Sequence, residues 1–256
     1  MSFPTVNLEG GLLSTEVLEQ LAQTELGGQR PESFGLAKSA RLSDEIARAW
    51  SDARAFWDAY GRMLERTPSE ETATSDTRER WMLPLLRVLG YELRYQPRAA
   101  RVERDTFAIS HRAITDAQAE ETEDEDAPPV HIVGARQSLD RRESSQIRLS
   151  PHALVQEYLN RTEHLWGVVT NGEQLRLLRD SQRTAKPTYV EFDLRQMLEG
   201  EHFADFALFY RLVHRSRLPQ GTEDAADCLL ESYHQEAIAQ GGRIRDRLRD
   251  SVEAAL

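Results

Sequence analysis

The sequence has a single cysteine, Cys228, and no long apolar run. A lone cysteine cannot form a disulfide within the chain, and in a helical pattern it is usually a small buried apolar residue. A membrane-spanning helix needs roughly 18 to 20 consecutive apolar residues, and no stretch here approaches that length. The opening segment, MSFPTVNLEGG, lacks both the basic and the apolar region of a secretory signal. These absences predict a cytoplasmic protein without membrane association.

Lysine is also scarce, so the 32 basic residues are nearly all arginine, and the formal net charge is −11. The acidity is concentrated in residues 116–126, DAQAEETEDED, which hold seven carboxylates and no basic residue. Without these seven charges the remainder, at −4, is close to balanced. A segment of this composition cannot bury apolar surface, and we expect a disordered acidic loop over 115–128. A nucleic-acid surface would therefore be a local basic patch, because the protein as a whole is acidic.

Residues 1–77 are predicted to form a helical N-terminal part. Along 42–64, apolar residues recur at spacings of three and four, which predicts an amphipathic helix. Ser14 is a suitable N-cap for a shorter helix before it. A further helix is predicted to end at Gly90, with Pro84 marking a kink or a restart within it.

The pattern changes in the middle of the chain, where strands and helices alternate. The clearest feature is a hairpin over 162–178, in which Asn171 and Gly172 supply the turn between two apolar strands. The predicted order is a strand at 100–110, a strand at 128–136, a helix at 150–164, the hairpin, and a strand that runs into a helix at 187–198. This is the order of a restriction-nuclease core. The expected fold class is therefore α/β, or α+β, with a restriction-endonuclease-like mixed central sheet flanked by helices and helical parts at both ends.

Active restriction-nuclease cores hold one or two divalent cations with an Asp on one strand and a Glu-x-Lys motif on the next. Residues two apart on a strand share a face, which fixes that spacing. Here Asp105 aligns with the Asp, whereas Gly134 and Arg136 stand in place of Glu and Lys. Glycine offers no ligand, and arginine is a poor general base although it binds phosphate well. We expect no catalytic residue and no metal here, unless Asp140 or Glu143 substitutes as a ligand.

Basic residues follow directly after this degenerate motif, in the loop 139–148, LDRRESSQIR. Arg136, Arg141, Arg142 and Arg148 could follow a DNA backbone. A solvated loop with internal salt bridges explains the same residues equally well. Three separated histidines have no ligand spacing and are expected to have structural or surface roles: His111, His131 and His152.

Four stretches together resemble the N-terminal region of large bacterial restriction-modification adenine methyltransferases: 83–113, 128–142, 149–181 and 189–219. These are the single-chain type IIG-like proteins and their relatives in phage-defence systems such as DISARM. The most specific element is the W-G-x-x-T-N-G hairpin, Trp166 to Gly172, which recurs in restriction subunits with this nuclease fold. Gln156 and Tyr158 resemble a Gln and Tyr pair near the site of active relatives, at a shorter spacing.

Motifs of the methyltransferase itself are absent from the sequence. An Asn-Pro-Pro-Tyr turn grips the flipped base, and a Gly-rich turn after a strand binds S-adenosylmethionine; neither is found, nor is a phosphate-binding loop or a zinc spacing. The resemblance implies no cofactor in this region and an S-adenosylmethionine-dependent domain beyond Leu256. An apolar stripe from Ile244 to Leu256 without a C-cap also favours a piece of a longer protein over a frayed natural terminus. Residues 201–256 would then be a helical connector.

Three functions stay open at this point. The favoured one is a non-catalytic, nuclease-like domain at 78–200 that contributes double-stranded DNA binding, or docking of other defence-system subunits, to a DNA adenine methyltransferase. The second is an active Mg-dependent DNA endonuclease, in which Asp105 and one of Asp140 or Glu143 share a cation. The third is a pure protein-interaction module without affinity for nucleic acid.

Overall fold

The predicted hairpin forms the centre of the main sheet. Its strands are β7 (Trp166–Thr170) and β8 (Gln174–Arg179). The Asn171 side chain closes the turn, because its Oδ1 accepts hydrogen bonds from the backbone N–H groups of Glu173 at 3.1 Å and Gln174 at 2.8 Å. Gly172 has φ +86°, a conformation that favours glycine. The hairpin prediction is confirmed with its turn residues.

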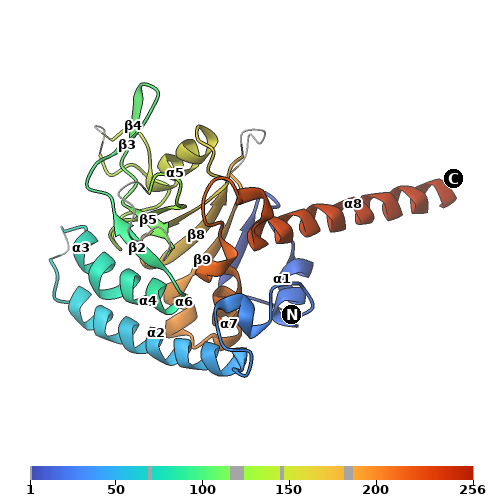
Figure 1. The fold of residues 1–256 in the computed structure, drawn as a ribbon, viewed down its shortest axis with the longest axis horizontal. Coiled ribbons are helices and arrows are strands. Elements are labelled where there is room, and N and C mark those ends of the chain that lie inside the picture. The colour runs from blue at the N-terminus through green and yellow to red at the C-terminus, as the bar shows by residue number, and fades with distance from the viewer. Residues whose placement is uncertain (1, 69–70, 116–123, 145–146, 182–186, 256) are drawn as a thin grey trace.

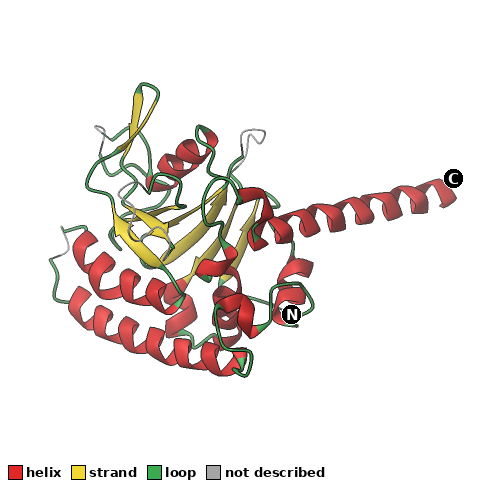
Figure 2. Ribbon diagram, viewed as in Figure 1, coloured by secondary structure: helices red, strands yellow, loops and turns green. Residues whose placement is uncertain are grey.

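The computed structural model describes residues 2–68, 71–115, 124–144, 147–181 and 187–255, with side chains up to residue 247. This part of the chain has a mixed α/β fold: a seven-stranded mixed sheet, a small two-stranded sheet, and helices in both terminal parts (Figures 1 and 2). The strands of the main sheet lie in the order β1 (Val6–Glu9), β9 (Tyr189–Asp193), β8, β7, β6 (Pro129–Ile132), β5 (His111–Ile114) and β2 (Glu92–Tyr95).

One pair of strands in the main sheet is parallel, and the other neighbours are antiparallel. The parallel pair is β6 and β7, which α5 (Pro151–Asn160) connects as a crossover helix. The side chain of Ser150 caps α5, accepting a hydrogen bond from the N–H of Ala153 at 3.3 Å. The sequence predicted this helix and its cap.

The two faces of the main sheet support two hydrophobic clusters. Side chains of β6 alternate between them, so that Val130 and Ile132 belong to the large cluster and Val133 to the small one. Helix α5 covers the small cluster through Val155 and Leu159. The helices that pack on the large cluster are α1 (Thr15–Ala22), α2 (Leu42–Leu64), α4 (Leu83–Val88), α6 (Leu194–Glu199), α7 (Phe203–Val213) and the first turns of α8 (Leu229–Ala255).

The remaining helical pieces connect these layers. The helix around Pro84 restarts as the sequence predicts, because the π-helical segment Thr77–Met82 gives way to α4 at Leu83. Gly90 follows with φ +79°. The short pieces are α3 (Thr74–Asp76) and the 3-10 turns Pro31–Phe34, Arg215–Arg217 and Ala225–Asp227.

Several strands differ from the sequence prediction. The single strand expected at 100–110 is a hairpin of β3 (Ala100–Val102) and β4 (Asp105–Phe107), because the chain reverses at Glu103, which has φ +53°. The strand expected at 128–136 ends at Ile132. Strands β1, β2 and β5 were not predicted, and β1 makes the helical N-terminal part contribute an edge strand to the sheet. Residues 116–123, most of the expected acidic loop, lie outside the described residues.

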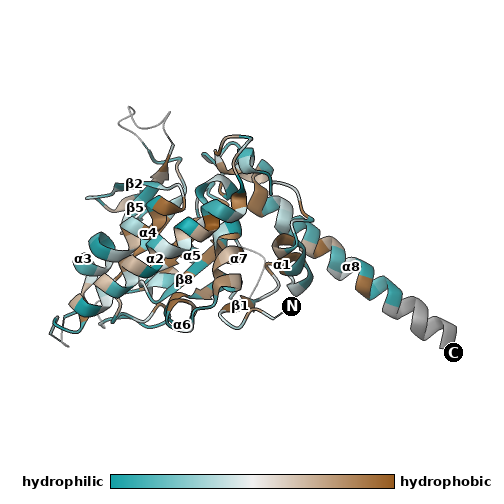
Figure 3. Ribbon diagram, turned by 90° about the horizontal axis from the view of Figure 1, so that it is seen from below, coloured by the Kyte–Doolittle hydropathy of each residue, from teal (hydrophilic) through white to brown (hydrophobic). Residues whose placement is uncertain are grey.

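Beyond its first turns, helix α8 extends away from the rest of the chain (Figures 1 and 3). Gln240 on this helix is buried, and its side-chain amide accepts a hydrogen bond from Ser14 and donates one to Gln20. The Gly241-Gly242 pair follows, and a Cβ at either position would meet no atom within 4 Å. In the part of the chain that the structure describes, no helix has the length and apolar character to cross a membrane.

Candidate functional site

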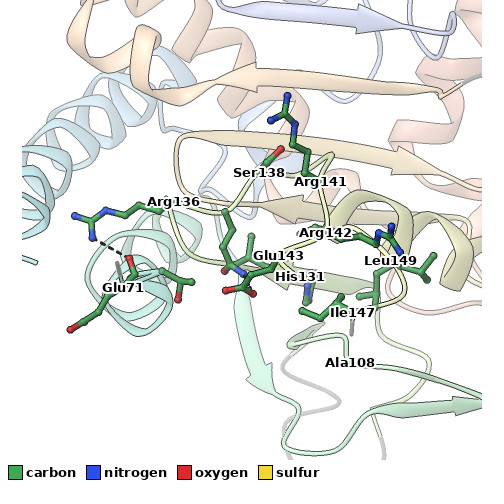
Figure 4. Close-up of a pocket in the computed structure, with 15 residues that line it drawn as sticks. Glu71, Ala108, His131, Arg136, Ser138, Arg141, Arg142, Glu143, Ile147 and Leu149 are labelled. Carbon is green, nitrogen blue, oxygen red and sulfur yellow. Dashed lines mark hydrogen bonds between the residues drawn. The ribbon is translucent and has the colours of Figure 1, made fainter. Parts of the chain in front are cut away.

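A cavity of about 530 Å³ opens at the carboxyl end of β6, between the loop that follows this strand and the first turn of α5 (Figure 4). Its floor includes His131 and Val133, and apolar walls come from Ile147, Leu149 and Leu154. The polar and charged lining residues are Glu71, Thr72, Arg136, Gln137, Ser138, Arg141, Arg142 and Glu143. Four of the eight site candidates named from the sequence line this cavity: Arg136, Arg141, Arg142 and Glu143.

The loop over 134–144 is anchored at several points. Asp140 is bound by the buried Arg176 of β8, through contacts of 2.6 and 2.8 Å. Asn171 in the hairpin turn donates its Nδ2–H to the carbonyl of Gln137 at 3.0 Å. The N–H of His152 in α5 bonds the carbonyl of Leu139 at 3.0 Å. The loop is held by both the sheet and the crossover helix, so its side chains occupy defined positions at the cavity.

Gly134 is fixed by close packing against the segment before α4. A Cβ at this position would lie 1.8 Å from the carbonyl oxygen of Thr72. Any side chain at residue 134 would therefore require the backbone to shift. The N–H of Gly134 donates to Oε1 of Gln137 at 2.7 Å. A metal-binding side chain at residue 134 is therefore sterically excluded in this backbone arrangement.

Arg136 points away from the centre of the cavity, towards the end of α2 (Figure 4). Its guanidinium donates to the carbonyl oxygens of Leu64 at 3.2 Å, Thr67 at 2.9 Å and Glu71 at 3.1 Å, and also to that of Pro68. Leu64 is the last residue of α2, and the other three carbonyls belong to the segment that follows it. The arginine predicted to contact phosphate is engaged as a cap of α2.

Asp105 lies on β4, in the two-stranded sheet, and the strands beside β6 are β5 and β7. The restriction-nuclease alignment expected Asp105 on the strand next to the one that leads to Gly134. The structure instead places Asp105 in the other sheet. Its carboxylate accepts from Arg161 at 2.5 Å and from Arg148 at 3.2 Å. The hydrogen bond from Arg161 is the main reason that the pKa of Asp105 lies below its ordinary value.

The two substitute carboxylates also have separate partners. The hydrogen bond from Arg176 lowers the pKa of Asp140. Glu143 instead accepts from Nε2 of Gln137 at 2.7 Å. Across the described residues, no three His, Cys, Asp or Glu side chains are grouped so that they could hold a metal ion. Asp105, Asp140 and Glu143 do not fit a shared Mg²⁺ site.

The four arginines predicted to bind nucleic acid fall into two classes. Arg136 caps α2, and Arg148 forms ion pairs with Asp105 and Glu157. Arg141 and Arg142 are exposed and line the cavity. Neither of these two has a hydrogen-bond or ion-pair partner among the described residues. Two guanidinium groups are therefore available to an anionic ligand at this site.

His131 is a cavity residue that the sequence analysis assigned to a structural or surface role. Its Nδ1 accepts a hydrogen bond from the backbone N–H of Ser110 at 3.3 Å, and burial lowers the pKa of the imidazole from 6.5 to about 4. The ring is thus neutral near pH 7, with its proton on Nε2. The signal in the sequence is its position two residues before Val133, which places it on the same face of β6.

The other residues singled out from the sequence lie outside this cavity. Gln156 donates to the carbonyl of Arg179 at 2.9 Å, while its buried Oε1 has no hydrogen-bond partner in the described part of the chain. The hydroxyl of Tyr158 accepts from Arg112 at 2.6 Å. His111 and His152 are buried and contact Ser110 and Arg176.

No protein-family model, curated protein or solved structure matches the chain. The binding chemistry of the site therefore follows from its lining residues alone. Two unpaired guanidinium groups, a neutral imidazole and an apolar wall can bind an anionic ligand with an apolar part. The described carboxylates do not converge on a position for a metal ion.

Proposed function

We propose that this chain is a nuclease-like domain without catalytic residues, which binds double-stranded DNA for an adenine methyltransferase of a bacterial restriction-modification or phage-defence system. The S-adenosylmethionine chemistry would belong to a separate methyltransferase domain. Subunits of the same defence system are further candidate partners.

The connectivity of the main sheet supports the nuclease-like part of this proposal. Helix α4 is followed by three antiparallel neighbours, β2, β5 and β6, and then by the crossover helix α5 and the parallel strand β7. The observed order is helix, three strands, helix, strand, whereas the sequence predicted two strands before the helix; the β3 and β4 hairpin replaces the strand predicted at 100–110 and lies outside the main sheet. The element that agrees with the prediction is the strand, crossover helix, parallel strand unit of β6, α5 and β7. The cavity lies at the end of β6, where the resemblance expects the degenerate motif.

The observation that carries the proposal is the pair Arg141 and Arg142. Both line the cavity and have no anionic partner among the described residues, although the chain carries a net charge of −11. Arginine side chains that contact phosphates supply most of the affinity in sequence-independent DNA binding. Because the protein is acidic as a whole, a DNA-binding surface on it would be a local basic patch. Two unpaired arginines on one anchored loop can supply such a patch.

The test is binding of the whole chain to a short fluorescent DNA duplex, measured by anisotropy over a series of salt concentrations, with and without Mg²⁺. We expect affinity that falls steeply with salt and DNA that stays intact on a gel. Absence of binding at low salt would refute the DNA-binding function. Cleaved DNA would refute the non-catalytic part and establish the endonuclease alternative, with Asp105→Ala as its first variant.

A docking function has its own support in α8. The side chains of Ile238 and Ile244 on this helix are 49% and 52% exposed, and the helix continues beyond the buried Gln240. If the chain is only a protein-interaction module, Arg141→Ala and Arg142→Ala will change assembly with a partner and no property of DNA.

A further inference from the structure

The cavity beside β6 contains a carboxylate that is held in place without a cation. Gln137 is fixed at Oε1 by the N–H of Gly134 at 2.7 Å and by Oγ1 of Thr74 at 3.2 Å, and its Nε2 donates to Oε2 of Glu143. Glu143 forms no ion pair with the described residues. An immobilised carboxylate with a free oxygen is a hydrogen-bond acceptor for a ligand that carries N–H groups.

The same cavity presents a donor and an apolar surface next to this acceptor. Nε2 of His131 carries the imidazole proton, because Nδ1 is engaged as an acceptor by Ser110. Ile147, which is 43% exposed, forms the apolar wall with Leu149 and Leu154. Figure 4 shows His131 and Glu143 near the centre of the cavity, with Ile147 and Leu149 on one side and Arg142 beside Leu149.

These groups match the parts of one nucleotide. A flat base with an exocyclic amino group offers N–H donors for Glu143 and a ring-nitrogen acceptor for His131, and its face suits an apolar wall. Its phosphate suits the unpaired guanidinium of Arg142. The volume of about 530 Å³ lies within the range of about 300–1,000 Å³ that small-molecule sites occupy.

We propose that this cavity binds a single unstacked nucleotide whose base carries an amino group, with the base edge at His131 and Glu143 and the phosphate at Arg142. In the proposed DNA-binding function, on which this assignment rests, the nucleotide would be one that leaves the helical stack at a strand end or a distorted site. In paired B-form DNA the bases are stacked, so a base edge and a base face are not both open to contact with a protein cavity.

The test uses AMP, CMP, the 5′-monophosphate of unsubstituted purine riboside (purine-MP, which lacks the amino group of AMP) and inorganic phosphate as probes. They are titrated into the whole chain and followed by calorimetry and by the imidazole NMR signals of His131. We expect AMP and CMP to bind and to shift the His131 signals, with purine-MP and phosphate at least tenfold weaker. Glu143→Gln should remove most of the preference for AMP over purine-MP, and Arg142→Ala should weaken AMP and purine-MP alike. The matched control is Glu163→Gln, because Glu163 is an exposed carboxylate outside the cavity. This substitution should change none of the nucleotide affinities.

The outcomes separate this proposal from the DNA-binding function. Duplex binding that depends on Arg141 and Arg142, without binding of any mononucleotide, overturns the nucleotide pocket and leaves the function in place. AMP binding without duplex binding supports the pocket and overturns the function. Equal binding of AMP, purine-MP and phosphate, unaffected by Glu143→Gln, reduces the site to a phosphate contact and overturns the assignment of a base.

Discussion

Arg176 on β8 holds the carboxylate of Asp140 with two of its guanidinium nitrogens, at 2.6 Å and 2.8 Å. The arginine side chain is 3% exposed, while that of the aspartate is 63% exposed. The third nitrogen, Nε, donates to Glu191 on β9 at 2.6 Å. A buried charge on the sheet is therefore neutralised in part by the loop that forms the cavity, which ties the position of Arg141 and Arg142 to the sheet beneath them.

Replacing Asp140 should loosen this loop. Asp140→Ala leaves Arg176 with Glu191 as its remaining carboxylate partner, and we expect a loss of about 1–3 kcal/mol in the free energy of unfolding, measured with urea. Affinity for DNA should fall at the same time because the arginine loop loses its anchor. Asp58→Ala, which removes an exposed carboxylate from α2, is the control for both measurements. Unchanged stability of the Asp140 variant would mean that the ion pair does not hold the loop.

Gly134 should not tolerate a side chain. In Gly134→Ala the new Cβ would meet the carbonyl oxygen of Thr72 at 1.8 Å, so the backbone must move, and we expect a loss of about 2–3 kcal/mol in the free energy of unfolding. Gly241→Ala is the opposite case, because its Cβ meets nothing within 4 Å in a helix. There we expect a gain of up to about 1 kcal/mol in helix stability. Equal effects of the two substitutions in chemical denaturation would contradict the packing at residue 134.

Arg136 should matter for stability and not for DNA. Arg136→Met removes the hydrogen bonds to the carbonyls at the end of α2, and we expect about 1–2 kcal/mol of destabilisation. The salt dependence of DNA binding should stay as in the unmodified chain. A clear reduction in that dependence would show that Arg136 contacts phosphate, as the sequence first suggested.

Acidification should destabilise the fold before the carboxylates titrate. Burial lowers the pKa values of His131, His152 and His164 from 6.5 to about 4. Between these pH values the unfolded chain binds more protons than the folded one, so the free energy of unfolding falls as the pH decreases from 6.5 towards 4. Each histidine contributes about 1.4 kcal/mol per pH unit. Urea titrations from pH 7.5 to 4.5 measure this slope, and a constant free energy of unfolding over that range would contradict burial of neutral histidines.

Local signals in the sequence predicted a large part of the fold. The Asn171-Gly172 turn, the Ser150 cap and the apolar spacing along α2 each act within a few residues, and each is confirmed. Strands β1, β2 and β5 were missed because they are short, at four residues each, and gain their place from partners distant in the chain. Short strands carry too few alternating residues to be recognised by periodicity.

For the candidate site, the sequence drew attention to the basic loop after β6, and the structure places Arg141 and Arg142 of this loop at the cavity. The partners of the other candidate residues were not predictable. Nothing in the local sequence reveals that Arg136 reaches the end of α2, or that Arg148 pairs with Asp105, since these partners come from other elements. The clash at Gly134 likewise depends on Thr72, far away in the sequence.

DNA binding at the cavity is tested most directly with two double variants that change the net charge equally. Arg141→Ala/Arg142→Ala removes the unpaired cavity arginines, and Arg243→Ala/Arg245→Ala removes two arginines from α8. We predict that the slope of log affinity for duplex DNA against log salt becomes less steep by about 1.8 in the cavity variant, for two lost phosphate contacts, and stays unchanged in the α8 variant. Identical slopes in both variants, or an unchanged slope in the cavity variant, would contradict a DNA-binding surface at this cavity.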